Sequence, residues 1–430
     1  MLSIEEVEAA LAREELSDFR RRARVGQRYY EADHDILRCR TFWFDQDGRL
    51  VEDRAHSGSR IPHPFFTELA DQLTAYILSG KENPFRSGDP ALQRELDRSF
   101  DDSFWAEIAD VLTDAYVRGS GYLYGYRDGE NRMAFQRADS LGITEVRPED
   151  SADGEKYVIY ETEDSTDFGR TPITRIQVWS REGVSCFIRR GGKIEADPDE
   201  GLHPMPHVLF RDADGRAWGQ SLGYIPFFRL DYDSRRRSGL LPVKAIIDDY
   251  DLMQSGLSNN LRDFDMPLYV VRGYDGDNLD ELQQNLRTRR IIGADSDGGI
   301  DIKTIDIPTE ARLAKLKEDE KNIYRFGMGF RSDQTGDGSI TNVVIRSRYT
   351  LLDLKAGKLE RRLKQVLRSI LEIVLKEIGE RTGKIYAPED VKIVFDRVIP
   401  TNEKENAEIR KIEAETEKIR KELENEWKEK

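Results

Sequence analysis

The first half of the chain changes from a helical to an extended pattern of apolar residues. Apolar side chains recur every three or four residues over 65–78 and 104–117, which predicts two helices. Ser3 and Glu6 have the spacing of a capping box, which predicts a further helix at the start of the chain. Beyond about residue 120 the apolar runs are short, rich in β-formers and separated by Asp-Gly and Glu-Gly turns. The pattern predicts an α+β domain that ends near residue 230.

A longer helix is predicted immediately after Pro242. Its apolar residues fall at steps of three and four, at Val243, Ile246, Tyr250, Met253, Leu257, Leu261 and Phe264. Spacing so close to a heptad favours a helix of about 33 Å that packs side by side with another helix. The opposite face carries Asp248, Asp249, Asp251, Asn259, Asn260 and Asp263. On this pattern alone, an ordinary helix with one solvated face is the simpler explanation.

The rest of the chain alternates short polar inserts with helices. The sequence RRIIGADSDGGIDIKTIDI at 289–307 predicts a small β-rich insert, and residues 273–306 carry eight Asp/Glu and four Lys/Arg, a local balance of −4. Glycines and short polar residues over 331–341 cannot make a stable helix. The longest helix follows over 342–378, and residues 343–378 carry nine Lys/Arg and four Asp/Glu, a balance of +5. The last thirty residues predict a charged helix whose heptad pattern is too short to be stable without neighbours.

The composition argues against a general nucleic-acid binder. Charged residues make up 35% of the chain and the net charge is −15, whereas such binders usually carry a basic balance. The two cysteines, Cys39 and Cys186, show no metal or redox spacing, which favours a reducing compartment. No signal peptide or membrane-spanning run is recognisable, so we expect a soluble protein that is cytoplasmic where it is made.

Motifs for catalysis are weak in this sequence. The GSGYLYG stretch at 119–125 misses the dinucleotide fingerprint and is better explained by turn glycines, and no phosphate-binding loop of the GxxxxGK[ST] type is present. His203 and His207 are separated by prolines that prevent a metal-binding helix. The aspartates of 231–237 and 248–251 could belong to a metal-dependent nuclease, but a solvated helix face explains them more simply. We expect no catalytic site, no cofactor and no metal.

Seven segments, in order, resemble one family. They are YYEADHDI at 29–36, GYIPF at 223–227, VKAIIDDYD at 243–251, LSNNLRDF at 257–264, YVVRGY at 269–274, the Gly338-Ser339 loop with the helix behind it, and FDR at 395–397 with PTNE at 400–403. Together they resemble the portal proteins of tailed double-stranded DNA bacteriophages, in the siphophage branch. Ala32 stands where that family usually has glycine, and residues 340–346 differ from the sequence that the family usually has there.

The resemblance implies an α+β portal fold that assembles as a ring, normally twelvefold. In chain order it implies an α/β wing at 1–239, a stem helix at 240–266, a small α/β clip at 267–308, a second stem helix at 309–330, a tunnel loop at 331–341, a long helix and return strand of the wing at 342–401, and a short helical crown at 402–430. Known members continue further, so we expect either a short crown or a trimmed chain.

The resemblance also implies roles for individual residues. The tunnel loop would contact DNA through Ser332, Gln334, Thr335, Gly336, Gly338 and Ser339. The clip would offer docking positions at Asp275, Asp277, Asp295 and Asp297. From the charge pattern we expect Asp248, Asp251 and Asn259 to face the channel, because an acidic wall repels phosphate, whereas each Lys or Arg contact would hold the DNA. The basic long helix would then lie between subunits, against acidic neighbours.

As a portal protein the chain would form a ring at one vertex of the capsid, the conduit for DNA packaging and ejection and the docking site for the terminase and the head-completion and tail proteins. Its partners would be further copies of itself, double-stranded DNA in transit, the terminase large subunit, a head-completion or adaptor protein, and the major capsid and scaffold proteins, without a membrane. It would reside in the virion after assembly in the host cytoplasm. The alternatives are another virion protein, such as a scaffold-like coiled-coil assembler, and, more remotely, a metal-dependent nuclease.

Overall fold

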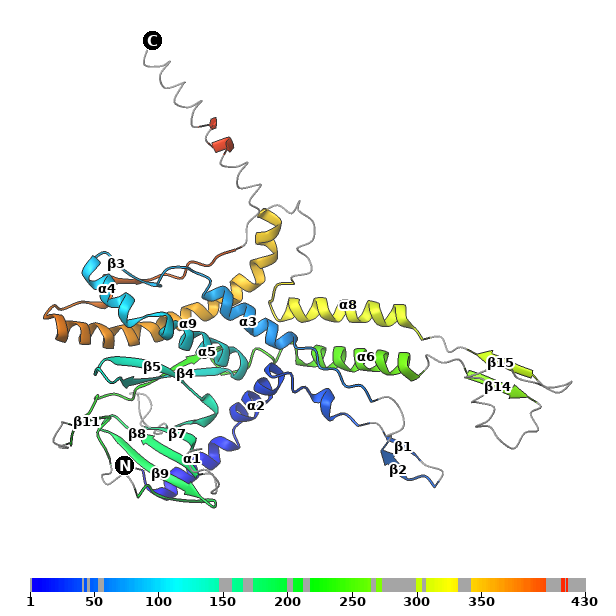
Figure 1. The fold of residues 1–430 in the computed structure, drawn as a ribbon, viewed down its shortest axis with the longest axis horizontal. Helices are drawn as coiled ribbons and strands as arrows, with labels where there is room; N and C mark the ends of the chain where they lie inside the picture. Colours follow the sequence, from blue (N-terminus) through cyan, green and yellow to red (C-terminus); the bar gives the residue numbers. More distant parts are fainter. Residues whose placement is uncertain are drawn as a thin grey trace, which may run out of the picture. The chain divides into compact units, whose positions relative to one another are not determined.

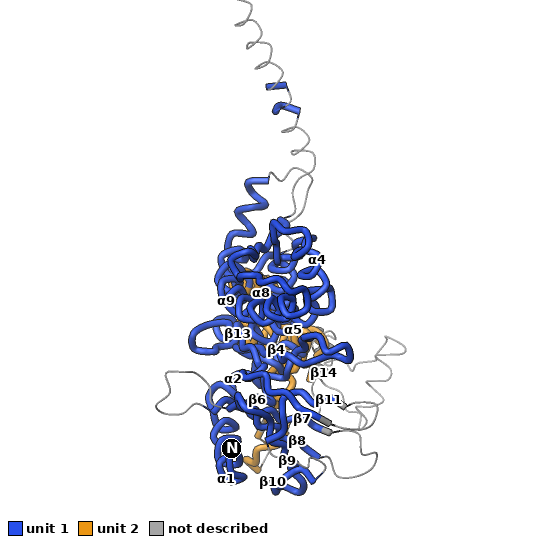
Figure 2. Tube along the Cα trace, turned by 90° about the vertical axis from the view of Figure 1, so that its left-hand side faces the viewer, with its two compact units in different colours: residues 1–32, 64–243, 324–430 blue, residues 33–63, 244–323 orange. Residues whose placement is uncertain are grey.

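The chain folds into two compact units. Unit 1 comprises residues 1–32, 64–243 and 324–430, and unit 2 comprises residues 33–63 and 244–323 (Figures 1 and 2). The computed structural model describes residues 2–40, 42–44, 47–52, 58–146, 157–164, 173–198, 204–211, 217–263, 268–272, 299–303, 307–331, 342–399, 411–413 and 415–416. Segment 33–63 lies within the range expected for the wing, yet it groups with residues 244–323.

Unit 1 begins with two helices beside a five-stranded antiparallel sheet. The helices are α1 (Ile4–Glu15) and α2 (Asp18–Tyr30). The sheet has the order β10-β9-β8-β7-β6, from β6 (Ile143–Val146), β7 (Tyr157–Asp164), β8 (Ile173–Trp179), β9 (Val184–Arg190) and β10 (Lys193–Ala196). Val7 and Leu11, one turn apart on α1, pack with Ile159, Ile176 and Phe187 of the sheet. Apolar residues at i and i+4 on the helix therefore meet alternate residues of the strands in one core.

The remainder of unit 1 packs helices around a three-stranded sheet. Its helices are α3 (Phe65–Ile77), α4 (Pro90–Ser99), α5 (Asp102–Arg118) and α9 (Asn342–Thr382). The sheet has the order β13-β4-β5, from β4 (Ser120–Arg127), β5 (Met133–Ala138) and β13 (Phe227–Asp231). Two short pairs complete the unit: β3 (Phe85–Ser87) with β16 (Val391–Ile393), and β11 (Val208–Arg211) with β12 (Ala217–Gln220).

Gly119 makes the turn from α5 into β4. It has a left-handed backbone with φ of 96°, and an added Cβ would lie 2.3 Å from the carbonyl oxygen of Arg236. Only glycine fits both conditions. This residue of the GSGYLYG stretch is therefore a structural glycine, as the sequence indicated.

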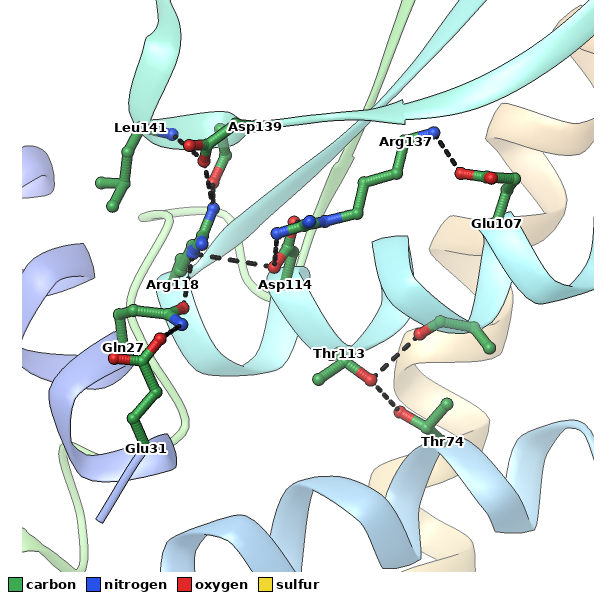
Figure 3. A network of polar contacts seen from close by, with 12 residues as sticks. Gln27, Glu31, Thr74, Glu107, Thr113, Asp114, Arg118, Arg137, Asp139 and Leu141 are labelled. Atoms are coloured by element: carbon green, nitrogen blue, oxygen red, sulfur yellow. Dashed lines mark hydrogen bonds and ion pairs between the residues drawn. The ribbon is translucent and has the colours of Figure 1, made fainter. Parts of the chain in front are cut away.

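A partly buried network of polar and charged side chains links α2, α5 and β5 (Figure 3). Arg137 binds Asp114 with two hydrogen bonds of 2.6 and 3.0 Å. Arg118 donates to Gln27 at 2.8 Å and pairs with Asp139 and, at 3.6 Å, with Asp114. Burial raises the pKa of Asp114 even though both arginines favour its charged form. The network holds these side chains in place where α5 leads into β4.

The described residues of unit 2 form two α-helices and two small β-pairs. The helices are α6 (Lys244–Asp263) and α8 (Thr309–Phe326), which Figure 1 shows side by side. The pairs are β1 (Phe42–Phe44) with β2 (Leu50–Glu52), and β14 (Leu268–Arg272) with β15 (Gly299–Lys303). Because β14 follows α6 and β15 precedes α8, the chain runs through α6, β14, β15 and α8 as a helical hairpin with a strand pair at its turn. A short 3₁₀ helix (Asp35–Arg38) leads into the β1–β2 hairpin.

Most of the predicted helices are confirmed. The expected ranges 65–78, 104–117 and 342–378 correspond to α3, α5 and α9, and Ser3 and Glu6 make both hydrogen bonds of a capping box. The helix after Pro242 is confirmed as α6. The sequence patterns missed α4 and its neighbour β3. Most of the predicted C-terminal helix lies outside the described residues.

Ala32, where the family usually has glycine, adopts a left-handed backbone with φ of 58° directly after α2. A Cβ strains this conformation, so Ala32→Gly is expected to raise the free energy of unfolding by about 1 kcal/mol. Denaturant unfolding followed by circular dichroism measures the change. The control is Ala9→Gly, at an exposed position inside α1, which should lower stability by about 1 kcal/mol. A loss of stability in both variants would contradict the prediction.

Candidate functional site

The polar face of α6 is the first candidate site, and its three neighbouring aspartates have different surroundings. Asp249 pairs with Lys315 of α8 at 2.5 Å on the surface, and Asp248 pairs with Lys244 at 2.7 Å. Asp251 has no exposed surface at all. The expectation that Asp251 faces a channel is therefore wrong, because its carboxylate lies inside unit 2. That Asp248 and Asn259, both partly exposed, face a channel stays a prediction.

Segment 58–63 covers this part of α6 and is bound to it through its main chain. The amide of Ser59 donates to Asn259 at 2.8 Å, and the amide of Ile61 donates to Ser255 at 3.0 Å. Two residues of extended chain advance about 6.6 Å and four residues of helix about 6 Å, so alternate amides meet side chains one turn apart. The segment runs antiparallel to α6. Its main-chain amides bind side chains of α6 on the face that the sequence pattern assigned to solvent.

Asp251 forms the end of this arrangement. Its Oδ1 accepts the amide N–H of His63 and the Nδ1 of the same residue, both at 2.9 Å. Its Oδ2 lies 2.6 Å from Nδ1 of His34, which is also fully buried. Burial opposes the charge, but the hydrogen bonds from His34 and His63 outweigh it and hold the pKa of Asp251 below its ordinary value. The carboxylate thus joins two distant segments of the sequence, at residues 34 and 63, to α6.

A histidine–aspartate–histidine group raises the question of a metal. Both Nδ1 atoms are occupied by the carboxylate, with His34 on one oxygen and His63 on the other. Among the residues that the structure describes, no group of three or more His, Cys, Asp or Glu side chains could hold a metal ion. The described part of the chain also contains no helix long and apolar enough to cross a membrane. The chemistry of this group is that of a hydrogen-bonded anchor.

The predicted contact residues of the tunnel loop and of the clip cannot be placed. Ser332, Gln334, Thr335, Gly336, Gly338 and Ser339 lie outside the described residues, as do Asp275, Asp277, Asp295 and Asp297.

The chain just before residues 332–341 is held firmly in unit 1. Gln72 of α3 bonds both main-chain groups of Phe330, accepting from its amide at 2.9 Å and donating to its carbonyl at 2.7 Å. The ring of Phe330 stacks on Tyr349 of α9, with ring centroids 4.4 Å apart. Sequence reasoning missed both partners, because a glutamine on a helix face carries no signal for a main-chain contact 258 residues away.

Lys355 of α9 supports the same junction from inside. Lys355 is only 3% exposed, and its ammonium group lies over the ring of Tyr116 at 4.8 Å and donates to the carbonyl of Gly327 at 2.8 Å. Burial lowers the pKa of Lys355 to about 7. Desolvation is the cause of that lowered pKa, and among the described residues the ammonium group contacts a carbonyl and an aromatic ring in place of water. A buried, weakly compensated lysine is costly, and it lies where the end of α8 joins the segment that follows.

Comparison with known proteins gives one consistent result. The family model described as "Phage portal protein, SPP1 Gp6-like" matches residues 12–424. The chain is 24% identical over 345 residues to the portal protein of Bacillus phage SPP1, covering 80% of this chain and 67% of the relative. It is 22% identical over 410 residues to the portal protein of a Clostridium phage, phiCD119, covering 87% of this chain and 85% of the relative.

Proposed function

Since the chain belongs to the family of phage portal proteins, SPP1 Gp6-like, we propose that it forms a ring at one vertex of the capsid through which DNA is packaged and ejected. The observation that carries the proposal is the family match, which extends over nearly the whole chain. The ring would be a dodecamer, with the terminase large subunit and then a head-completion protein docking on it, and with capsid and scaffold proteins around it.

The helical hairpin of unit 2 supports this proposal. Helices α6 and α8 lie side by side and the strand pair β14–β15 closes their far end, as a stem that carries a clip would require. An ion pair at 2.5 Å between Asp249 and Lys315 links the two helices at the surface. In the proposed ring these helices line the passage, and Asp248 is the acidic group of α6 that we assign to its wall.

The net charge of −15 suits a conduit that does not hold its cargo. Each phosphate that a Lys or Arg neutralises releases counterions and strengthens binding, so a basic wall would stall a moving duplex. An acidic chain avoids this and leaves contact with DNA to a few positions. In this proposal those positions are the residues of 331–341.

Electron microscopy of the purified, negatively stained protein tests the ring. We expect rings with a central hole at least as wide as a duplex, about 20 Å, and a native mass that corresponds to about twelve copies. A monomer with metal-dependent nuclease activity would overturn the proposal in favour of an enzyme. Fibres or bundles without a central hole would favour a scaffold-like assembler.

A further inference from the structure

Helix α9 has a second face that no other described segment of the chain covers. One face is buried in unit 1 through Leu352, Leu359, Leu363, Ile370 and Val374. The residues of the other face are all exposed and follow one another at steps of four, four, three, four, three, four and three: Val343, Ser347, Leu351, Leu354, Lys358, Arg361, Gln365 and Arg368. We call these eight residues the exposed seam. Heptad-like spacing keeps them on one side of the helix, where a neighbouring helix can pack along them.

The first part of the exposed seam is apolar. Val343 is 74% exposed, Leu354 is 60% exposed and Leu351 is 38% exposed. Single apolar residues on a surface are ordinary, but Val343, Leu351 and Leu354 lie on one helix face, interrupted by Ser347, and leave apolar surface in contact with water. Burying this apolar surface against another protein surface recovers its hydrophobic free energy.

The second part of the exposed seam is basic, and its charges are uncompensated. Within the part of the chain that the structure describes, Lys358, Arg361 and Arg368 form no ion pair; Lys358 only lies over the ring of Tyr232 at 5.9 Å. Residues 343–378 carry a balance of +5 in a chain of net charge −15, so all other residues together carry −20. Another copy of this chain therefore offers mainly acidic surface to a basic helix.

We propose that the exposed seam of α9 is an interface on which a second copy of the chain packs an acidic face. The inference rests on the proposed ring. In a ring of more than two subunits each contact between neighbours joins two different surfaces, so every subunit needs a patch that complements another patch of its own sequence. The exposed seam meets this need through charge, and its apolar part supplies the buried contact.

Duplex DNA is the other polyanion that a basic helix could bind. A phosphate backbone would satisfy Lys358, Arg361 and Arg368, but it would leave the row of Val343, Leu351 and Leu354 without an apolar partner. A protein surface accommodates both halves of the exposed seam. The combination of an apolar and a basic part therefore favours a second copy over DNA.

The test has two arms on the full-length protein. In the first, copies labelled with ¹⁴N and ¹⁵N are assembled together and treated with a zero-length reagent that joins lysine to carboxylate. We expect Lys358 to form cross-links between differently labelled copies. In the second arm, R361E/R368E is compared with the matched control R190E/K193E, an equal charge change at exposed positions of β9 and β10. The concentration for half-assembly, from light scattering, is expected to rise at least tenfold for the seam variant alone.

Each remaining outcome overturns the inference and is distinguishable from the others. Rings of R361E/R368E that form at wild-type concentrations, with no cross-link from Lys358 to another copy, would overturn it and leave the proposed function standing. Normal rings that retain less duplex DNA in a gel-shift assay would assign the exposed seam to DNA. Wild-type protein that forms no ring at all would overturn the proposed function together with the inference.

Discussion

Replacing Asp251 with alanine is expected to lower the free energy of unfolding of unit 2 by about 3–5 kcal/mol, because it breaks a buried set of charge-assisted hydrogen bonds. The carboxylate has no exposed surface and accepts three N–H groups, two from His63 and one from His34. In the variant these donors remain buried and lose their acceptor, and the removed atoms leave a void. Segment 58–63 loses its contact at residue 63 with α6.

Hydrogen exchange read by mass spectrometry measures this effect where it occurs. Protection of α6 and of segment 58–63 should fall in Asp251→Ala, while that of α5 in unit 1 stays unchanged. The matched control is Asp249→Ala, two residues earlier on the same helix, whose ion pair with Lys315 is exposed at 44% and 42%. Such surface pairs contribute only about 0–1 kcal/mol, so the control should stay close to wild type. Equal losses of protection in both variants would show that Asp251 is no special anchor.

Local periodicity was sufficient to predict the long helices. The apolar spacing along α3, α5 and α9 reflects a single core that each helix faces, so the pattern and the structure agree within a few residues. Helix α4 was missed because only Leu92 and Leu96 of its ten residues are buried. Two apolar positions one turn apart are too few to stand out from a loop.

The role of Asp251 could not be predicted from the helix that carries it. On α6 it looks like Asp248 and Asp249, and the pattern of one solvated face describes all three. Asp251 differs from the other two because segment 58–63 binds it through a main-chain amide. A main-chain amide is common to nearly all residue types, so the sequence gives no signal for such a contact. His34 and His63 are far from Asp251 in sequence, at separations of 217 and 188 residues. Only the folded chain brings these groups together.

Lys355 illustrates a similar limit. It stands among many Lys and Arg residues of a basic helix, where a charged side chain is expected in water. The next basic residue, Lys358, is exposed, whereas Lys355 is buried against Tyr116 and Gly327. The difference arises because Gly327, directly after α8, and Tyr116 of α5 pack against α9 at Lys355. The apolar spacing along α9 contains no information about these contacts.

Lys355→Met is expected to remove a pH dependence from the stability of unit 1. The pKa of Lys355 is lowered to about 7 in the folded chain, against about 10.4 in an unfolded one. Between these values the unfolded state binds more protons, so stability rises with pH through this window and is lowest below about pH 7. From pH 7 to pH 9, the free energy of unfolding of the wild type should rise by about 2 kcal/mol through this effect. Methionine fills similar space without a charge, so the variant should lack this rise.

At pH 7 the same substitution is expected to stabilise the protein, since removing the cost of burying an ammonium group outweighs the about 1–3 kcal/mol lost when the buried carbonyl of Gly327 is left without its donor. Thermal unfolding at pH 7, 8 and 9 measures both effects. Lys384→Met, at an exposed position beyond α9, is the control and should retain the wild-type pH dependence. A wild-type stability that does not rise between pH 7 and 9 would mean that Lys355 keeps an ordinary pKa. If stability does rise between pH 7 and 9, the chain tolerates a destabilising lysine at the junction with α8. A Lys355→Met protein that forms more stable rings but packages DNA poorly would show that this destabilising lysine serves function.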